Sequence, residues 1–306
     1  MKQKVKLVVV IPVGTISSKN RYEHIADTVA SIVHYATPDR RIVIQDNSNP
    51  MHLGARLQTE FPELDVVRAP ENYGMYGGLY KSLSLAFLHV QATYDFQVLM
   101  KMDTDALMTG DGLEDDAIAY FESHPNVGEI GTYCSNGEAI AWPRKRLQYE
   151  VSVRGWLQDR KRCAFLRYYL QLALSHGYIP GEHVLGGVSI FRPELIDKLV
   201  QGDFLLREDL RRTKLQEDHL WGLFCKVVGM ELATFESPEH PLGVVWRGMP
   251  CAPQEAVDKG LKAVHSTRSW KDMNEDQIRA FFRGQREAVT QDAPQPVITS
   301  PELVEV

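Results

Sequence analysis

The chain has 306 residues, 44% of them hydrophobic and 24% charged, and its 40 acidic and 34 basic residues leave a formal net charge of −6. Disordered chains contain fewer apolar residues, nucleic-acid-binding proteins are usually basic, and no run of about 20 apolar residues is present to cross a membrane, so these three classes are excluded. The four cysteines lie far apart without a C-x-x-C pair, which argues against a zinc knuckle and a disulfide framework. We therefore expect a cytoplasmic, globular protein.

The first hundred residues alternate between strand and helix patterns. β-Branched and apolar runs predict strands at 5–11, 41–45, 65–68 and 96–102, and apolar residues at helical spacing predict helices around 25–33 and 79–90. This alternation is typical of βαβ units that form a parallel sheet. Ligands of such sheets bind outside the carboxyl ends of the strands, so the residues that follow each strand are the candidates for a functional site.

The alternation becomes less regular after Leu107. The sequence predicts a strand at 127–133, a helix at 155–176, a strand at 183–191 and a helix that includes Leu220 and Phe224. Gly186 and Gly187 in the third of these indicate close approach of backbone or ligand. Without repeats or a clear linker, we expect an α/β fold with a mostly parallel, Rossmann-like sheet flanked by helices. Two abutting halves, 1–108 and 109–288, would form one domain, followed by a mobile tail at 289–306.

The predicted helix at 155–176 combines basic and aromatic residues. It carries Arg160, Lys161, Arg162 and Arg167, together with Trp156, Phe165, Tyr168 and Tyr169. The favoured interpretation is a half-exposed packing helix, because aromatic residues on a helix are more often core. The alternative is a surface that contacts an acceptor or an anionic lipid, which would be at most a peripheral membrane contact.

Asp103 and Asp105 follow the strand at 96–102, in the sequence MDTDA. Two carboxylates that turn toward the same crevice repel each other unless a cation lies beside them. Mg²⁺ and Mn²⁺ prefer oxygen ligands and use one or two carboxylates together with substrate phosphates. The alternative is that Asp103 caps a turn and Asp105 is solvated.

Further polar residues stand at other element ends. Asp46 follows the strand at 41–45, where a carboxylate can accept hydrogen bonds from a ribose or a base. The stretch from Asn72 through Lys81 is glycine-rich, but it lacks the G-x4-G-K-[ST] spacing of a P-loop.

Two more candidates lie in the second half of the chain. Glu217 and Asp218 begin a helix, where carboxylates act as N-terminal caps or, in a crevice, as a general base. His265 is either a structural histidine or a metal ligand.

The order of these motifs along residues 5–265 resembles that in the GT-A glycosyltransferases, particularly those of family 2. The resemblance rests on IPVG with Asn20-Arg21, QDNSNP, ENYGMYGGLYKSL, MDTDA, GGVSIFRPELI and QEDHLW. It implies donor-binding roles for Pro12, Val13, Gly14, Arg21, Asp46, Asn72, Gly74, Gly77, Lys81, Asp103, Thr104, Gly186 and Gly187. It implies Asp105, His265 and Asp103 as metal ligands for Mn²⁺ or Mg²⁺, and Asp218 with Glu217 as the catalytic pair.

The resemblance implies transfer of a sugar from a nucleotide-diphosphate donor, by default a UDP-sugar, to a hydroxyl or amine of a saccharide, lipid-linked, peptide or small-molecule acceptor. Inversion is favoured, with Asp218 as general base. Three alternatives stay open. A haloacid-dehalogenase-like phosphatase would also use Asp103 and Asp105, although its motif lies near the chain start and has Thr or Val where this sequence has Leu107. A non-catalytic sugar-nucleotide-binding module would not need Glu217 and Asp218. A nucleotidyltransferase would need a glycine-rich loop with Arg and Lys after the first strand.

Overall fold

A seven-stranded sheet forms the centre of the protein. The computed structural model describes residues 2–17, 21–235 and 241–292. The strands lie in the order β3-β2-β1-β4-β7-β6-β8, and β7 is antiparallel to both neighbours while the other pairs are parallel. Their bounds are β1 Gln3–Val13, β2 Arg40–Asp46, β3 Asp65–Arg68, β4 Tyr94–Met102, β6 Val127–Cys134, β7 His183–Phe191 and β8 Glu231–Thr234. The predicted α/β class with a mostly parallel sheet is confirmed.

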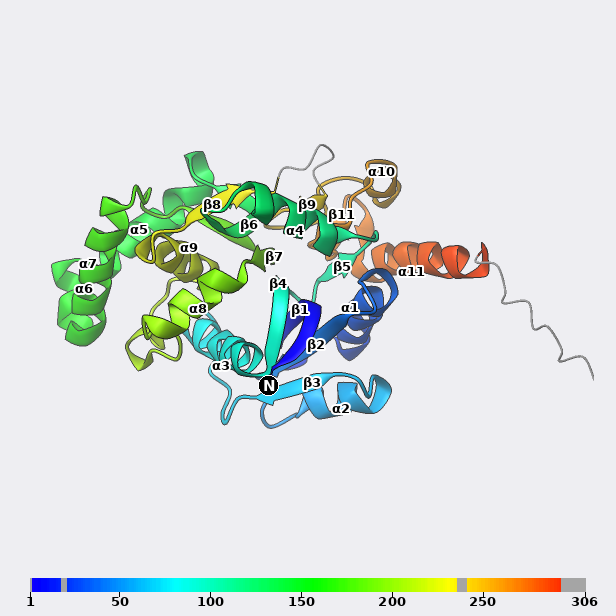
Figure 1. Ribbon diagram of the computed structural model, residues 1–306, viewed down its shortest axis with the longest axis horizontal. Coiled ribbons are helices and arrows are strands. Elements are labelled where there is room, and N and C mark those ends of the chain that lie inside the picture. The colour runs from blue at the N-terminus through cyan, green and yellow to red at the C-terminus, as the bar shows by residue number, and fades with distance from the viewer. Residues whose placement is uncertain (1, 18–20, 236–240, 293–306) are drawn as a thin grey trace, which may run out of the picture.

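Helices cover both faces of this sheet (Figure 1). On one face lie α1 (Tyr22–Tyr35), α2 (Leu53–Glu60) and α4 (Leu113–Ser123), and on the other α3 (Gly77–Thr93), α8 (Pro193–Gln201) and α9 (Glu217–Val227). Side chains alternate across a strand, so Leu7 and Val9 of β1 join the first core while Val8 and Val10 join the second. Because both faces are covered, β1 is apolar from Leu7 to Val13, as a buried parallel strand should be.

A second, small sheet connects the centre to the C-terminal segment. It consists of β5 (Ala106–Met108), β10 (Ala263–His265) and β9 (Leu242–Val244). Around it lie α10 (Pro253–Asp258), the β11–β12 pair (Ser269–Trp270 and Met273–Asn274) and α11 (Glu275–Asp292). These elements share a small core that includes Val264, Ile278 and Phe282. Helix α11 packs against α1 and lies at one end of the molecule in Figure 1.

The structure corrects two predicted boundaries. The helix expected at 155–176 is two helices, α6 (Val153–Gln158) and α7 (Arg160–Ser175), because Asp159 interrupts the first and accepts the backbone N–H of Arg162 as the N-cap of the second. Helix α11 continues to Asp292, past the expected start of the tail at 289, and residues 293–306 lie outside the described residues. The division at 108 stays a prediction. Two short 3₁₀ helices, η1 (Gly137–Ile140) and η2 (Glu208–Leu210), and α5 (Ala141–Glu150) complete the elements. Across the described ranges, we find no helix with the length and apolar content needed to span a bilayer.

Candidate active site

The loop that carries Asp103 and Asp105 is held by its backbone. The N–H of Asp103 donates to the carbonyl of Gly187 on β7 over 2.9 Å. The carbonyl of Thr104 accepts the hydroxyl of Thr28 on α1 at 3.0 Å, and that of Asp105 accepts the N–H of Thr267 at 2.8 Å. This short loop is therefore bound by β7, by α1 and by the C-terminal segment, so the two carboxylates occupy defined positions.

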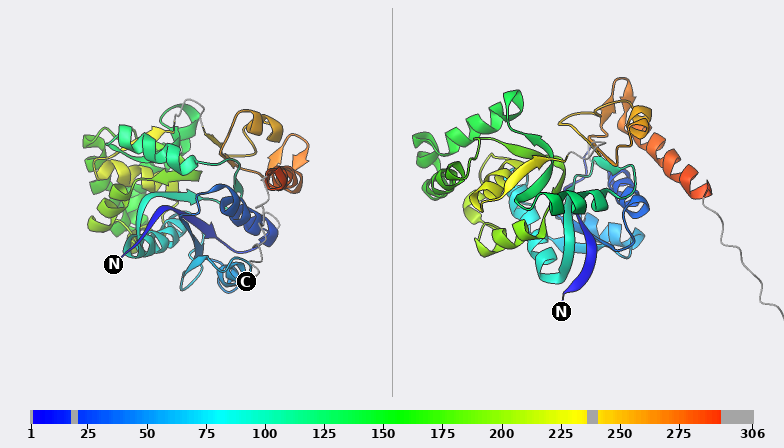
Figure 2. Two further views of the ribbon diagram at one scale, coloured as in Figure 1. Left: turned by 45° about the vertical axis from the view of Figure 1, so that its right-hand side comes forward. Right: turned by 45° about the horizontal axis from the view of Figure 1, so that its top comes forward.

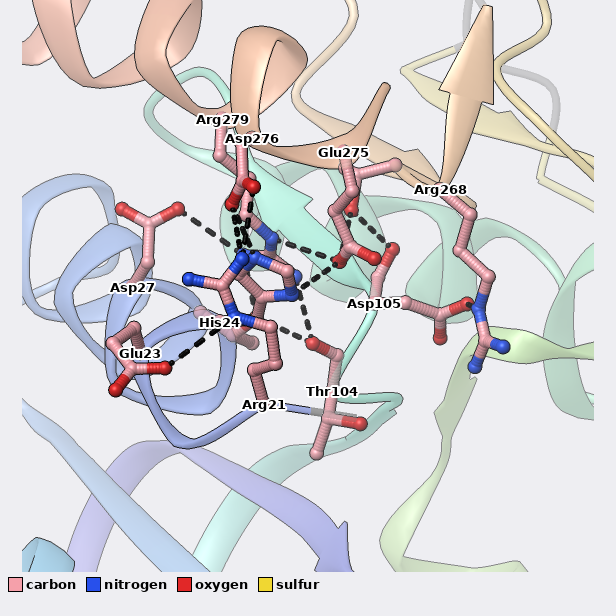
Figure 3. Close-up of polar contacts among 12 residues, drawn as sticks. Arg21, Glu23, His24, Asp27, Thr104, Asp105, Arg268, Glu275, Asp276 and Arg279 are labelled. Atoms are coloured by element: carbon pink, nitrogen blue, oxygen red, sulfur yellow. Dashed lines mark hydrogen bonds and ion pairs between the residues drawn. The ribbon is translucent and has the colours of Figure 1, made fainter. Parts of the chain in front are cut away.

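Helix α11 contributes a buried ion-pair network to the same loop (Figure 3). Arg279, only 1% exposed, pairs with Asp27 of α1 at 3.1 Å and donates to the carbonyl of Thr104 at 2.8 Å. Arg286 pairs with the other oxygen of Asp27. Because a buried carboxylate needs partners to offset its lost hydration, this network ties α1, α11 and the Asp103–Asp105 loop into one unit.

His265 lies beside both aspartates. Strand β5 begins directly after Asp105 and pairs with β10, so that Ala106 lies opposite His265. The Nε2 atom of His265 is 3.4 Å from Oδ1 of Asp105 and 3.9 Å from Oδ2 of Asp103. The antiparallel pairing of β5 with β10 therefore brings a histidine from the C-terminal segment onto the motif that follows β4.

The chemistry of these three side chains fits a divalent cation. One ligand atom from each lies within 4.8 Å of the others. Nδ1 of His265 lies 2.9 Å from the carbonyl of Val245, to which it donates, so Nε2 is directed at the carboxylates in the way metal-ligating histidines are usually held. Burial would raise the pKa of Asp105, but the hydrogen bond and charge of His265 and the charge of Arg268 hold it well below its usual range. The half-exposed Arg268 pairs with the other carboxylate oxygen of Asp105, Oδ2, at 2.6 Å.

Glu217 and Asp218 lie at the start of α9 and are both buried. The N-cap of this helix is Gln216, which forms a capping box with His219, so neither Glu217 nor Asp218 is the N-cap residue itself. Oδ1 of Asp218 accepts the backbone N–H of His219 at 2.8 Å. Oδ2 of Asp218 has no hydrogen bond to any residue that the structure describes, and it faces Gly186.

The two carboxylates differ in protonation. Burial raises the pKa of Glu217 to about 7 despite the charge of Lys101. Burial also acts to raise the pKa of Asp218, but His219 and His183 in their protonated forms, together with the charge of Lys101, outweigh it in the acidic range where Asp218 titrates, and the pKa lies below its usual range. Asp218 is therefore the partner that is ionised at neutral pH.

Lys101 joins the aspartate cluster to this pair and was not identified from the sequence. Its buried Nζ lies 2.6 Å from Oδ1 of Asp103 and 3.3 Å from Oε1 of Glu217, and it donates to the carbonyl of Gly186. Burial would lower the pKa of Lys101, but the charges of Asp103 and Glu217 raise it above its usual range. The available signal was a lysine inside an otherwise apolar buried strand, two residues before Asp103 and therefore on the same face.

Gly186 and Gly187 of β7 separate the two clusters. A Cβ on Gly187 would lie 2.3 Å from the ring of His265, and one on Gly186 would lie 3.0 Å from Oε1 of Glu217. No larger residue fits at Gly187 without displacing His265. The sequence predicted close approach of backbone or ligand at these glycines, and the structure places side chains of the site, those of Glu217 and His265, against them instead.

His183, Asp218 and His219 form a second cluster whose ligand-type atoms lie within 4.8 Å of one another. Nδ1 of His219 accepts the N–H of Gln216 at 3.2 Å, so the proton of the neutral ring is on Nε2. Burial lowers the pKa of His219 to about 4, which keeps the ring neutral. Because a ligating Nε2 must be unprotonated, this tautomer does not suit a metal, and the two histidines serve as neighbours of Asp218.

Asp46 has a different role from the predicted nucleoside contact. It is fully buried, and its carboxylate accepts the N–H and hydroxyl of Ser48 and the N–H of Gly54, the last at 3.1 Å. These bonds fix the turn between β2 and α2. No oxygen of Asp46 is exposed to a ligand in this arrangement, so the structure does not support the direct contact.

Three other predicted donor-binding residues are engaged elsewhere. Arg21 pairs with Asp276 of α11 at 2.8 Å, and its neighbour Asn20 lies outside the described residues. Lys81 pairs with Glu208 and lies 4.7 Å from the ring centre of Tyr73. A Cβ on Gly77 would lie 1.9 Å from the carbonyl of Leu210. Gly77 therefore permits backbone packing rather than approach of a phosphate.

The remaining predicted residues lie at the end of β1 or in the segment before α3, and Val13 among them is buried. Pro12, Val13 and Gly14 stand where β1 ends, and a Cβ on Gly14 or Gly74 would have no atom within 4 Å. The exposed side chain of Asn72 accepts the N–H of Gly74 at 2.8 Å. Their contacts with a donor stay predictions.

No protein-family model and no curated protein sequence matches the chain. Among solved structures, the chain is similar to S. aureus TarS 1–349, with 14% identity, a TM-score of 0.43 and coverage of 97% of this chain and 76% of that one. It is also similar to the apo structure of the bifunctional glycosyltransferase WbbM, with 12% identity and a TM-score of 0.47. That match covers 95% of this chain and 52% of WbbM, so the chain spans about half of WbbM. The functional argument rests on the site.

Proposed function

We propose that this protein is a metal-dependent, inverting glycosyltransferase. It would transfer a sugar from a nucleotide-diphosphate donor, by default a UDP-sugar, to an acceptor hydroxyl or amine. One observation carries the proposal: the Asp103–Asp105–His265 cluster and the Glu217–Asp218 pair lie on either side of Gly186–Gly187 and are joined by Lys101. A diphosphate held by Asp103, Asp105 and His265 would present its sugar toward the Glu217–Asp218 pair.

Asp103, Asp105 and His265 would hold the cation, Mg²⁺ or Mn²⁺. When bound, such an ion neutralises the charge that develops on the leaving diphosphate. The chain itself supplies fixed ligand positions, through the backbone bonds to the loop and the tautomer of His265. Lys101 orients Asp103, because its Nζ lies 2.6 Å from Oδ1 of that carboxylate.

Asp218 would accept the proton of the attacking hydroxyl or amine. Its Oδ1 is fixed by the N–H of His219, which leaves Oδ2 for the acceptor. Glu217 is the weaker candidate because Lys101 already lies 3.3 Å from its carboxylate. A single displacement at the anomeric carbon inverts its configuration.

The acceptor would lie next to Trp142. This residue of α5 is 48% exposed, and its ring centre is 5.5 Å from that of His219, the neighbour of Asp218. An exposed indole offers an apolar face together with an N–H donor, a combination suited to a sugar ring.

The test uses nucleotide binding and then turnover. UDP and GDP should raise the unfolding temperature with Mn²⁺ and not with EDTA, and Asp105→Ala should remove that shift. At a nucleotide concentration 100-fold above the dissociation constant, binding adds about 2.7 kcal/mol to the free energy of unfolding. Equal stabilisation in EDTA would contradict the metal assignment.

Asp218→Asn should then reduce sugar transfer by about 100-fold or more while nucleotide binding persists. Glu217→Gln is the matched control and should have a smaller effect on transfer. If neither substitution changes the rate of sugar transfer, the mechanism is wrong. The mechanism is also wrong if the Asp218→Asn and Glu217→Gln variants hydrolyse a simple phosphomonoester as well as each other instead of transferring sugar.

A further inference from the structure

Residues 141–179, which we call the basic lobe, differ in charge from the rest of the chain. They comprise α5, α6, α7 and the loop that follows, and Figures 1 and 2 show these helices gathered at the end of the molecule opposite α11. The lobe contains eight basic and two acidic residues, a net of +6, in a chain whose total is −6. The rest of the chain therefore carries −12.

Most of the positive charge of the basic lobe is on its surface, and both of its carboxylates are paired with arginines. Glu150 is buried and pairs with Arg146 and Arg162, and Asp159 caps α7. Six basic side chains are exposed, and within the described part of the chain none of them forms an ion pair: Arg144, Lys145, Arg154, Arg160, Lys161 and Arg167. The lobe thus presents cations to solvent without any exposed acidic residue.

The same lobe exposes large apolar side chains. Of the ten exposed large hydrophobic residues among the described ranges, seven belong to it: Trp142, Val153, Trp156, Leu157, Tyr168, Leu174 and Ile179. Leu157 is 70% exposed and Val153 is 68% exposed. Scattered single cases need no explanation, but this clustering on one lobe does, because exposed apolar patches mark interaction sites.

The cationic and apolar side chains share one surface. On α7 the exposed positions include 160, 161, 164, 167, 168, 171, 174 and 175, which recur at helical spacing and form a single stripe. The opposite face packs into the core through Leu166 and Ala173. Arg160 of α7 lies 4.4 Å from the ring centre of Trp156 on α6, so the stripe continues onto the neighbouring helix.

We propose that the basic lobe docks on the surface of an anionic lipid bilayer. Lysine and arginine would bind the headgroups, while Trp156, Leu157 and Tyr168 would enter the boundary with the acyl chains, as on interfacial amphipathic helices. The anionic bilayer surface would repel the acidic remainder of the chain, so the lobe would be the side that contacts the bilayer. The proposal does not depend on sugar transfer.

Flotation of the full-length protein with vesicles tests this. Wild type should float with phosphatidylcholine–phosphatidylglycerol vesicles at low salt, should bind pure phosphatidylcholine vesicles much more weakly, and should be released at high salt. Each basic residue near an anionic surface contributes about fivefold to partitioning, or ~1 kcal/mol. The triple variant Arg154→Gln, Arg160→Gln, Lys161→Gln should therefore bind about 100-fold more weakly.

A matched control removes the same charge elsewhere. Lys4→Gln, Lys259→Gln, Lys271→Gln changes three exposed lysines outside the lobe and should stay within about threefold of wild type. Val153→Ser, Leu157→Ser should weaken vesicle binding by about tenfold or more, because it removes exposed apolar surface of α6. Circular dichroism and unfolding midpoints establish that each variant is folded.

Four results would overturn the proposal: no flotation of wild type with anionic vesicles, equal binding to neutral vesicles, an equal loss in the control variant, or tighter binding of duplex DNA that Val153→Ser, Leu157→Ser does not weaken. The last would assign the lobe to nucleic acid. Flotation involves no sugar transfer, so its outcome and that of the turnover test are independent.

Discussion

Replacement of Glu217 by Gln should make the stability of this protein less dependent on pH. The ordinary pKa of a glutamate is 4.5, and burial raises that of Glu217 to about 7. Between these values the folded protein holds a proton that the unfolded chain releases, so the free energy of unfolding of wild type falls as pH rises. Glutamine resembles the protonated glutamate in shape and does not titrate, so the variant lacks this loss.

The pKa interval sets the size of the effect. At 1.36 kcal/mol per unit, the full interval corresponds to ~3 kcal/mol, of which ~2.5 kcal/mol falls between pH 5 and pH 8. The variant should therefore gain about that much stability over wild type when the pH is raised from 5 to 8. Lys101, which lies 3.3 Å from the carboxylate, already lessens the cost of ionisation, and the interval includes its contribution.

Urea unfolding at the two pH values, in EDTA so that no cation occupies the neighbouring cluster, measures this difference. Glu122→Gln is the control, because this glutamate of α4 is exposed, and its stability relative to wild type should vary by no more than about 0.5 kcal/mol between the two pH values. A difference between Glu217→Gln and wild type that is also constant within about 0.5 kcal/mol would refute the reasoning, since Glu217 would then titrate in the folded protein as it does in the unfolded chain.

Three further outcomes follow from the site. Burial acts to lower the pKa of His265, but the charge and hydrogen bond of Asp105 raise it above 6.5, so a proton competes with the cation for this ring. Calorimetry should therefore show that Mn²⁺ affinity rises by up to about tenfold per pH unit over the range in which His265 is protonated. A pH-independent affinity would contradict the assignment of His265 as a ligand. Asp46→Ala should lower the free energy of unfolding by about 2–4 kcal/mol, because three buried donors lose their acceptor; a change in donor KM without this loss would restore its nucleoside role. Arg279→Met should cost about 3–5 kcal/mol by leaving Asp27 underpaired, measured by urea unfolding, and a cost below 1 kcal/mol would show that Arg286 suffices.

Local patterns in the sequence determined the class of fold and the place of its chemistry. Strands at 65–68 and 183–191 have the predicted bounds, because β-branched runs between turn residues depend on near neighbours only. The rule that ligands gather at strand ends follows from backbone geometry, so Asp103 and Asp105 could be located without coordinates. Asp159 shows the limit of such patterns, since one capping side chain divided a helix that apolar spacing predicted as continuous.

Tertiary structure decided which polar residues meet and which are already used. His265 joins Asp103 and Asp105 through the pairing of β5 with β10, a contact between segments far apart in the chain that periodicity does not encode. Lys101 proved to be part of the site although the sequence did not indicate it, and Asp46 proved to be buried in a turn although a ligand contact was expected. Burial and hydrogen-bond partners decided both outcomes, and these are properties of the packed chain. A buried charge must find an opposite charge or hydrogen-bond donors wherever the fold places them, and the sequence names the charge but not its partner.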